Sequence, residues 1–487
     1  MVVLPGIGGT VLAPPNRLDS PVWDAGFRDI GNLLMRPHEL SLAEHKVLTP
    51  VGLIRTHKAF GLYAAVHGYG GLLDRLAGLP EALLDDGTVR PNLDANVVAV
   101  GYDFRLGVIS AAEELDRQLV PRLERLWPRP RDRAGRLLFV AHSMGGLVAR
   151  YWLAHDENWR SCRGVLTLGT PHRGAPKALD VLANGIAVKG VHLIKGRVRE
   201  LAREWPGVYD LLPRYAAIRD DTAPAPGRQT AAPCNGEPRQ TRWLRPTQLP
   251  LPWLTGPAAD AERMHAQIET AWTGMPRTGP RVEPRIGYGH STLRACVWDG
   301  KRVRVTTGSD GLPPSPGWDD DDGDGTVPAV SGLPIEMTAE PPLGMRVPLR
   351  HGHIVDLDQV TGWVESAEGR PPPTAIHGQE RPVVLGVTLD AVTLAGESTP
   401  IAATVHGIPG SPAASPVVAV AAGTDRARTV AARARLTWDD ALGGFAGDLP
   451  ALAPGLYEVS VYAEAVPDAG DLLTQASLEV VDGAQLD

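Results

Sequence analysis

Short apolar runs without polar alternation recur along the first 350 residues, separated by stretches with helical spacing. A continuous apolar run of four to eight residues is typical of a strand buried on both faces of a parallel sheet. Such runs lie at residues 1–4, 95–101, 137–140 and 164–169. Residues 111–126 instead place leucines at helical spacing and predict an amphipathic helix. The alternation of strands and helices predicts an α/β domain with a parallel sheet.

A different pattern follows residue 369. The segment Gly-Arg-Pro-Pro-Pro at 369–373 indicates an extended linker, because consecutive prolines stop a helix. Beyond it, apolar and polar positions alternate in short segments separated by Gly, Pro and Asp turns. We therefore expect an α/β domain at 1–368, a linker at 369–378 and a small antiparallel β-sandwich of immunoglobulin-like type at 379–487. Such modules usually bind, space or dimerise, so this one predicts an unidentified protein partner.

Two segments interrupt the α/β rhythm, at about 14–75 and 182–284. A long insertion inside an α/β core most often forms a cap or lid. Within the second segment, residues 259–272 resemble a helix. Its apolar side chains either cover an apolar substrate or form a small core of the cap. A lid with such side chains also allows peripheral contact with a membrane. These side chains are Trp243, Leu249, Leu251, Trp253 and Leu254.

The segment LLFVAHSMGGLVARYWL at 137–153 passes from a buried strand to a helix through a tight turn. Ser143 lies at the tip of this turn, where a serine hydroxyl stands above the sheet as a candidate nucleophile. Gly145 supplies the small neighbour that close packing of helix on strand requires, and Ala141 replaces the usual glycine of G-x-S-x-G by the smallest possible side chain. The alternative is a helix capped by Ser143 whose glycines only permit packing.

Two backbone amides are candidates to bind an oxyanion. The N–H of Met144 follows the serine at a helix N-terminus, where negative charge is favoured. The first apolar run ends in PGIGGT at 5–10, and amides in a glycine-rich turn after a strand can converge on one point. We expect the N–H of Ile7 to be the second donor, although a strand followed by such a turn is more often only a tight turn.

The acidic segment WDDDDGDGTVP at 318–328 contains the candidate acid. Asp324 lies between two glycines that allow the backbone to bend sharply, and we expect it to turn inward. A calcium loop is the alternative, because Asp320 and Asp322 match the opening of an EF-hand. The match fails at its twelfth position, which is Ser331 instead of glutamate.

The candidate base follows a predicted last strand at 345–350. His351 leaves this strand immediately, whereas His353 lies a turn further on, and the residues themselves leave both open. The order Ser143, Asp324, His351 is that of nucleophile, acid and base in α/β-hydrolases. Elsewhere, His172 follows a predicted strand, but a capping or surface role is commoner for a lone histidine. Asp103 and Arg105 are expected to pair and brace the sheet.

Composition narrows the function classes. The net charge of −8 among 487 residues is mild and forms no basic stripe, which argues against nucleic acid as a partner. The three cysteines are odd in number and far apart, so neither a disulfide framework nor a zinc site is predicted. The first residues lack the basic segment and apolar core that are typical of a secretory leader, and no apolar run reaches membrane-spanning length. We expect a cytoplasmic protein that needs no metal and no cofactor.

The motifs VVLPGIGGTVL, GYDFR, AHSMGGLVARY, TLGTPHRGAPKAL and GDGTVP, with the histidine segment, resemble the lecithin:cholesterol acyltransferase-like branch of the α/β-hydrolases, which includes bacterial lipases. The resemblance spans residues 1–365 and implies Ser143 as nucleophile, Asp324 as acid and Ile7 as oxyanion donor. It also favours His351 over His353, because an aliphatic residue and a valine follow it at the family's spacing. The acyltransferases of this branch are secreted or membrane-anchored with disulfides, so their substrates are not carried over.

The sequence therefore predicts a serine hydrolase of lipid-like carboxylic esters that forms an acyl-enzyme on Ser143. Transfer of the acyl group to an alcohol uses the same acyl-enzyme, so an O-acyltransferase remains an alternative. A second alternative is a catalytically inactive protein that keeps the hydrolase fold and binds a partner through the sandwich.

Overall fold

The computed structural model describes residues 1–24, 37–55, 68–88, 91–185, 192–222, 242–306, 323–338, 345–367, 383–390, 392–408, 411–424 and 428–482. The predicted linker and the acidic residues 319–322 lie outside these ranges. No helix in the described ranges is long and apolar enough to cross a bilayer.

A seven-stranded parallel sheet forms the centre of the first domain within the described residues. Its strands are, in spatial order, β13 (Arg346–Val347), β10 (Arg281–Gly287), β7 (Cys162–Leu168), β6 (Leu137–His142), β1 (Val2–Leu4), β5 (Val97–Ala99) and β4 (Leu84–Asp85). Three strands, β1, β5 and β6, are buried along their whole length, as predicted from their continuous apolar runs. The α/β-hydrolase class is confirmed by this sheet and its helices.

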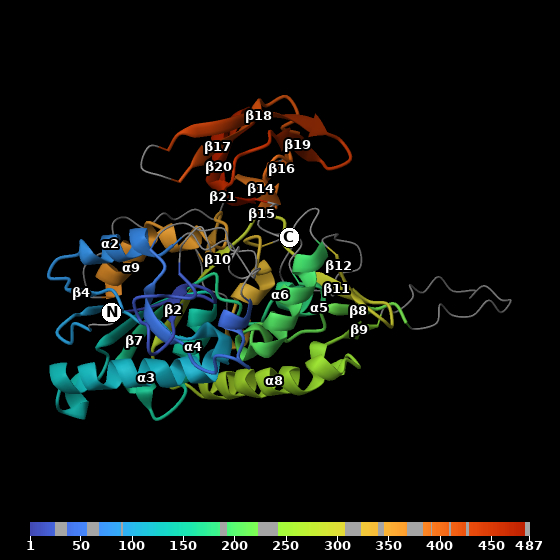
Figure 1. Cartoon of the computed structure of the whole chain (residues 1–487). Coiled ribbons are helices and arrows are strands. Elements are labelled where there is room, and N and C mark those ends of the chain that lie inside the picture. The colour runs from blue at the N-terminus through green and yellow to red at the C-terminus, as the bar shows by residue number, and fades with distance from the viewer. Residues whose placement is uncertain are drawn as a thin grey trace, which may run out of the picture.

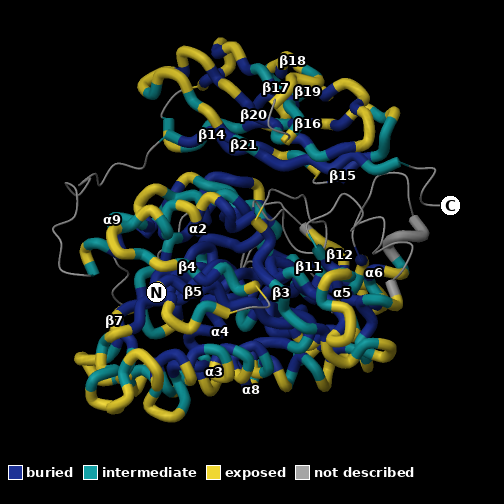
Figure 2. The backbone as a smooth tube through the Cα atoms, turned by 60° about the vertical axis from the view of Figure 1, so that its left-hand side comes forward, coloured by how far each residue is buried: buried dark blue, intermediate teal, exposed yellow. Residues whose placement is uncertain are grey.

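Helices cover both faces of the sheet (Figure 1). One face carries α3 (Gly107–Leu126), α4 (Met144–Leu153) and α8 (Pro252–Thr273), and the other carries α2 (Gly70–Ala77) and α9 (Gln359–Ala367). Three more helices follow β7, namely α5 (Pro176–Asn184), α6 (His192–Glu204) and α7 (Pro206–Tyr209). In Figure 2 the sheet is almost entirely buried, whereas the outer turns of α3 and α8 are exposed. We call the part from β1 to α9 the sheet domain.

The C-terminal half of the segment expected to form a cap, 182–284, contains a long helix of the helix layer. Helix α8 begins at Pro252 instead of Ala259 and packs against α4 as part of the helix layer. Pro257 lies inside it, but the carbonyl that this proline leaves without an amide donor, that of Trp253, accepts a hydrogen bond from the Tyr209 hydroxyl at 3.1 Å. Of the apolar side chains assigned to the cap, Leu249 and Leu254 are buried in the main core and Leu251 and Trp253 pack against it.

The segment expected to form the first insertion, about 14–75, contains one described strand, β3 (Thr49–Leu53), and the helix α2. Strands β2 (Thr10–Ala13) and β3 pair in antiparallel fashion, and α2 already packs on β5, so residues 70–75 belong to the helix layer. Asp103 and Arg105 form the predicted pair through two hydrogen bonds of 2.6 and 2.9 Å. Their outer polar atoms also bind the backbone of the insertion, at Leu48 N–H and Leu40 O. The pair therefore fixes the insertion to the sheet.

A second sheet and several short 3₁₀ helices complete the sheet domain. The four-stranded sheet has the order β12 (Val303–Thr306), β11 (Ala295–Trp298), β8 (Ile218–Asp220), β9 (Trp243–Leu244). The 3₁₀ helices are η1 (Pro37–Leu40), η2 (Phe104–Leu106), η3 (Pro130–Arg133), η4 (Asn158–Ser161), η5 (Pro246–Gln248), η6 (Ala329–Gly332), η7 (Ile335–Met337) and η8 (Ile354–Asp356).

The C-terminal part is entirely β among the described residues, as predicted. In spatial order its strands are β14 (Val384–Leu389), β16 (Thr399–His406), β19 (Gly444–Leu449), β18 (Val430–Asp439), β17 (Val417–Gly423), β20 (Gly455–Val466), β21 (Gly470–Val481) and β15 (Val392–Leu394). One pair departs from the antiparallel prediction, since β15 runs parallel to β21. We call this part the β-domain; β14, β15 and β21 are the strands nearest the sheet domain (Figures 1 and 2).

Candidate active site

The turn between β6 and α4 has the strained geometry that its sequence predicts. The backbone of Ser143 adopts φ 52° and ψ −124°. A residue other than glycine adopts this conformation only where the surrounding fold enforces it. The fold enforces it through Gly145, where a Cβ atom would lie 2.6 Å from the carbonyl oxygen of Pro5. Helix α4 thereby sits directly against the end of β1.

His351 joins the serine to the acid. Its Nε2 lies 2.9 Å from Ser143 Oγ, and its Nδ1 lies 2.7 Å from Asp324 Oδ2. A carboxylate only accepts, so Nδ1 donates to Asp324 and Nε2 is left to accept the serine proton. All three side chains are buried, with exposed fractions of 1% for Ser143, 2% for Asp324 and 3% for His351.

The second oxygen of Asp324 is held by the backbone of its own turn. Oδ1 accepts hydrogen bonds from the N–H groups of Thr326 and Val327, at 2.9 and 2.7 Å. The backbone carbonyl of Asp324 also accepts from the N–H of His351 at 2.9 Å, so the acid and the base are linked twice. Asp324 turns inward as predicted, and its carboxylate contacts His351 and the backbone, which is not the arrangement of a calcium ligand.

The two histidines of the segment occupy different positions. His351 makes the hydrogen bonds to Ser143 and Asp324. His353 instead precedes the 3₁₀ helix η8, and its N–H donates to the carbonyl of Arg350 at 3.0 Å. The geometry favours His351. The preceding strand β13 is only two residues long, because Pro348 cannot donate to the ladder.

The predicted oxyanion donors flank the serine. Gly6 lies against it so closely that a Cβ atom there would be 2.7 Å from Ser143 Cβ and 3.3 Å from Oγ. The peptide group that carries the N–H of Ile7 therefore starts beside the hydroxyl. Met144 is the first residue of α4, and first-turn amides have no partner inside a helix. Neither N–H donates a hydrogen bond to any of the described residues.

Two strand-end glycines that the sequence did not single out make room for the acid and the base. Gly169 follows β7 with φ 58°, and a Cβ atom there would lie 3.1 Å from both Asp324 Oδ2 and His351 Nδ1. Gly287 ends β10, and its Cβ would lie 2.5 Å from Asp324 Cβ. The carboxyl ends of β1, β6, β7 and β10 thus meet at the site, as expected for an open α/β sheet.

A hydrogen-bonded chain behind the serine was also missed. The Tyr69 hydroxyl accepts from Gly6 N–H at 2.7 Å and lies 2.8 Å from His142 Nδ1, while His142 Nε2 lies 3.0 Å from the carbonyl oxygen of His351. Burial, and after it the neighbouring His351, lowers the pKa of His142 well below its usual range. Burial likewise raises the pKa of Tyr69. Both side chains are therefore neutral. In the sequence, the one local indication of this hydrogen-bonded chain is the histidine directly before Ser143.

His172 lies outside this arrangement. It is buried, with Nδ1 3.1 Å from Arg150 Nη1 and Nε2 3.2 Å from Thr167 Oγ1. Burial, followed by Arg150, lowers its pKa well below the ordinary value. Arg150 itself pairs with Glu336 and stacks on Trp272 at 4.9 Å. The expected surface position of His172 is therefore wrong, because its side chain is buried between Arg150 and Thr167.

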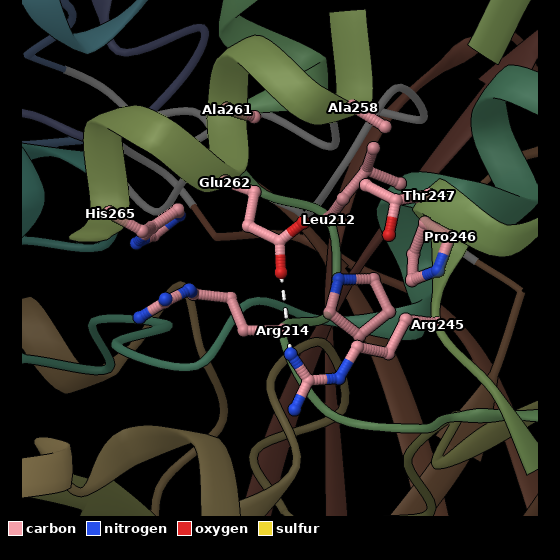
Figure 3. A pocket seen from close by; sticks show the side chains of 10 residues that line it. Leu212, Arg214, Arg245, Pro246, Thr247, Ala258, Ala261, Glu262 and His265 are labelled. Atoms are coloured by element: carbon pink, nitrogen blue, oxygen red, sulfur yellow. Dashed lines mark hydrogen bonds and ion pairs between the residues drawn. The ribbon is translucent and has the colours of Figure 1, made fainter. Parts of the chain in front are cut away.

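A small pocket between η5 and α8 shares no residue with the Ser143 site (Figure 3). Arg245 pairs there with Glu262 at 3.3 Å, and Arg214 pairs with Glu269. Because both arginines have carboxylate partners, we assign this pocket no role in substrate binding. The described residues also contain no cluster of three His, Cys, Asp or Glu side chains arranged to hold a metal.

Comparison with known proteins gives one family match, and the matched region includes the turn of Ser143. Residues 84–234 match the family described as lecithin:cholesterol acyltransferase, which confirms the resemblance for this segment and supports an enzyme that acts on lipid esters. A solved structure of the Bacillus licheniformis lipase BlEst2 in its propeptide form matches with 10% identity and a TM-score of 0.28, over 76% of this chain and 84% of that chain. No curated protein matches the chain.

Proposed function

We propose that the chain hydrolyses carboxylic, lipid-like esters through an acyl-enzyme on Ser143. The observation that carries this proposal is the position of one imidazole, that of His351, in hydrogen-bond contact with both Ser143 Oγ and Asp324 Oδ2. A hydroxyl, a base and an orienting carboxylate in this order are the minimum machinery of nucleophilic acyl transfer.

The groups act in sequence on a bound ester. His351 Nε2 takes the proton of Ser143 as Oγ bonds to the acyl carbon, and Asp324 stabilises the imidazolium through Nδ1–H. The carbonyl oxygen becomes an oxyanion, for which the N–H groups of Ile7 and Met144 are the donors. The ester C–O bond then breaks, and His351 returns the proton to the leaving alcohol. Water repeats the steps on the acyl-enzyme and releases the acid.

Acyl transfer is the second candidate, and the family match over residues 84–234 favours it. An alcohol that replaces water in the second half of the cycle gives a new ester from the same acyl-enzyme. The two reactions are separated by an acceptor competition assay, in which added alcohol diverts product from free acid to ester.

The test is labelling of the purified chain with a fluorophosphonate, with the modified peptide identified by mass spectrometry. We expect modification of Ser143 and none in Ser143→Ala. His351→Gln should lower turnover of p-nitrophenyl esters by about 10³-fold or more, whereas His353→Gln, the matched control, should stay close to wild type. A folded protein that is neither labelled nor active on esters of any chain length would contradict the proposal and favour an inactive binding protein.

A further inference from the structure

The β-domain touches the sheet domain at Gly289, in a segment that adjoins the Asp324 turn, and at Arg350, directly before His351. Among the described strands, β14 is at the end of its sheet and forms its ladder with β16. A Cβ atom at Gly386 would lie 2.2 Å from the carbonyl oxygen of Gly289. At Gly289, with φ 80°, it would lie 2.9 Å from Val384 Cγ1. The two backbones are therefore in direct contact.

The segment that β14 contacts, residues 287–292, also holds the turn of Asp324. Gly287 packs on the acid itself, as described above. The N–H of His290 donates to the carbonyl of Gly323 at 3.0 Å, and the N–H of Gly325 donates to Thr292 Oγ1 at 2.9 Å. Residues 287–292 thus form one layer between β14 and the acid, with hydrogen bonds on both sides of Asp324.

Arg350 makes the second connection, next to the base. Its Nη1 donates to the carbonyl oxygen of Val387 in β14 at 2.5 Å. On its other side it lies against the acid turn, where a Cβ atom on Gly325 would be 3.4 Å from Nη2. Burial lowers the pKa of Arg350 to about 10, and Asp324 opposes that shift, so the guanidinium stays charged at neutral pH. A single cation therefore joins the base segment, the acid turn and β14.

The two domains also share apolar packing. Val392 of β15 belongs to the same buried cluster as the strands of the central sheet, and Leu394 and Val481 pack against that cluster. If the β-domain served only to bind a partner protein, its side chains would not need to pack into the core of the sheet domain.

We infer that the β-domain is a positioning element of the site, and that β14 and Arg350 hold the Asp324 turn and the His351 segment in register with Ser143. This inference rests on the proposed function for its catalytic consequence, but its structural consequence is measurable without turnover. Loosening the contact should release both segments while Ser143, on its own elbow, stays in place.

The test uses the full chain and two glycine variants. Gly386→Ala places a methyl group against Gly289 across the domain contact. Gly444→Ala is the matched control, since its Cβ would lie 2.7 Å from the carbonyl of Ala403 inside the β-domain. Hydrogen exchange by mass spectrometry should show faster exchange at residues 323–328 and 350–354 in Gly386→Ala, and no change there in Gly444→Ala.

Kinetics supply the second readout. Gly386→Ala and Arg350→Met should lower kcat for p-nitrophenyl butyrate about tenfold with KM nearly unchanged, because the change displaces the acid and the base, which act in the chemical step. Arg350→Lys should keep a higher kcat than Arg350→Met. Because both changes act through the same contact, the double variant Gly386→Ala, Arg350→Met should have the same kcat as the single variant with the lower kcat.

Equal losses in Gly386→Ala and Gly444→Ala, or unchanged exchange at both segments, would overturn the inference. Arg350→Met keeps it testable if Gly386→Ala does not fold. A wild-type chain without ester turnover would contradict the proposed function alone, since the exchange measurement still decides whether β14 holds the two segments.

Discussion

His142 Nε2 donates a hydrogen bond to the backbone carbonyl oxygen of His351, 3.0 Å away. A carbonyl only accepts, so the proton is on Nε2, and Nδ1 accepts from the Tyr69 hydroxyl. Tyr69 in turn accepts from Gly6 N–H. The residue before the proposed nucleophile therefore links the segment of the proposed base to the turn of the proposed oxyanion donor.

Tyr69→Phe should break this link. The change leaves His142 Nδ1 and Gly6 N–H buried without a partner, which costs about 1–3 kcal/mol of the free energy of unfolding, and it should lower kcat more than it raises KM. The control is Tyr102→Phe, which removes a buried hydroxyl that donates to the Pro5 carbonyl but takes no part in the chain. Equal kcat values for the two variants would contradict a role of the chain in positioning.

Gly169→Ala should separate the acid from the base. Its new methyl group would press on Asp324 Oδ2 and His351 Nδ1, so we expect ester turnover to fall about 10²-fold. Gly135→Ala is the control, because Gly135 has a similar φ of 63° and nothing within 4 Å of a Cβ atom. Both variants have the same backbone strain, and only the first should lose activity at temperatures where both are folded.

Asp210→Asn should change how stability depends on pH. Burial raises the pKa of Asp210 from 3.8 to about 7, partly offset by its hydrogen bond from Val108 N–H. The folded chain thus binds this proton more tightly than the unfolded chain. The resulting stabilisation is complete below the unfolded pKa and is lost as the pH rises through 7, at up to about 1.4 kcal/mol per pH unit.

The asparagine variant keeps the shape and does not titrate, so its stability relative to wild type should rise between about pH 4 and about pH 7 in urea unfolding and stay constant above that. Asp94→Asn is the control, because Asp94 is exposed and Arg125 lowers its pKa. A difference between Asp210→Asn and wild type that is constant with pH would show that Asp210 does not titrate in this window.

Glu336→Gln should destabilise the fold without touching the site. Arg150 is almost fully buried against Glu336, and removal of the carboxylate charge leaves the guanidinium without this counter-ion. We expect a loss of about 3 kcal/mol in the free energy of unfolding. Glu157→Gln breaks an exposed pair with Arg160 and should leave the free energy of unfolding nearly unchanged. Similar losses in the two variants would mean that burial of the Arg150 pair has no energetic consequence.

Local patterns predicted the parts of the site that local structure determines. The elbow of Ser143 follows from an apolar run that changes to helical spacing at one serine, and the inward turn of Asp324 follows from its flanking glycines. The choice between His351 and His353 needed family spacing, because both follow the same short strand. The first residues of α8 gave no helical signal because a proline inside a helix removes one hydrogen bond. In the structure Tyr209, which is distant in sequence, satisfies the carbonyl that Pro257 leaves open.

Contacts between distant segments gave no such signal. Tyr69 and His142 are 73 positions apart, and Arg350 meets Val387 across a predicted linker. Gly169 resembles any strand-end glycine until Asp324 and His351 are placed beside it. These contacts depend on which strands lie next to each other in the fold, and no single stretch of the sequence shows that.

The central position of β1 has a consequence for how the chain acquires its fold. Val2–Leu4 pairs with Val97–Ala99 on one side and with Leu137–His142 on the other. During synthesis at about 5–20 residues per second, β6, the second neighbour of β1, is completed about seven seconds or more after β1. Pairings over such sequence distances are slow to close. The turn that follows β1 contacts Ser143 only after β1 has paired with β6. We therefore expect the active site to form late in folding.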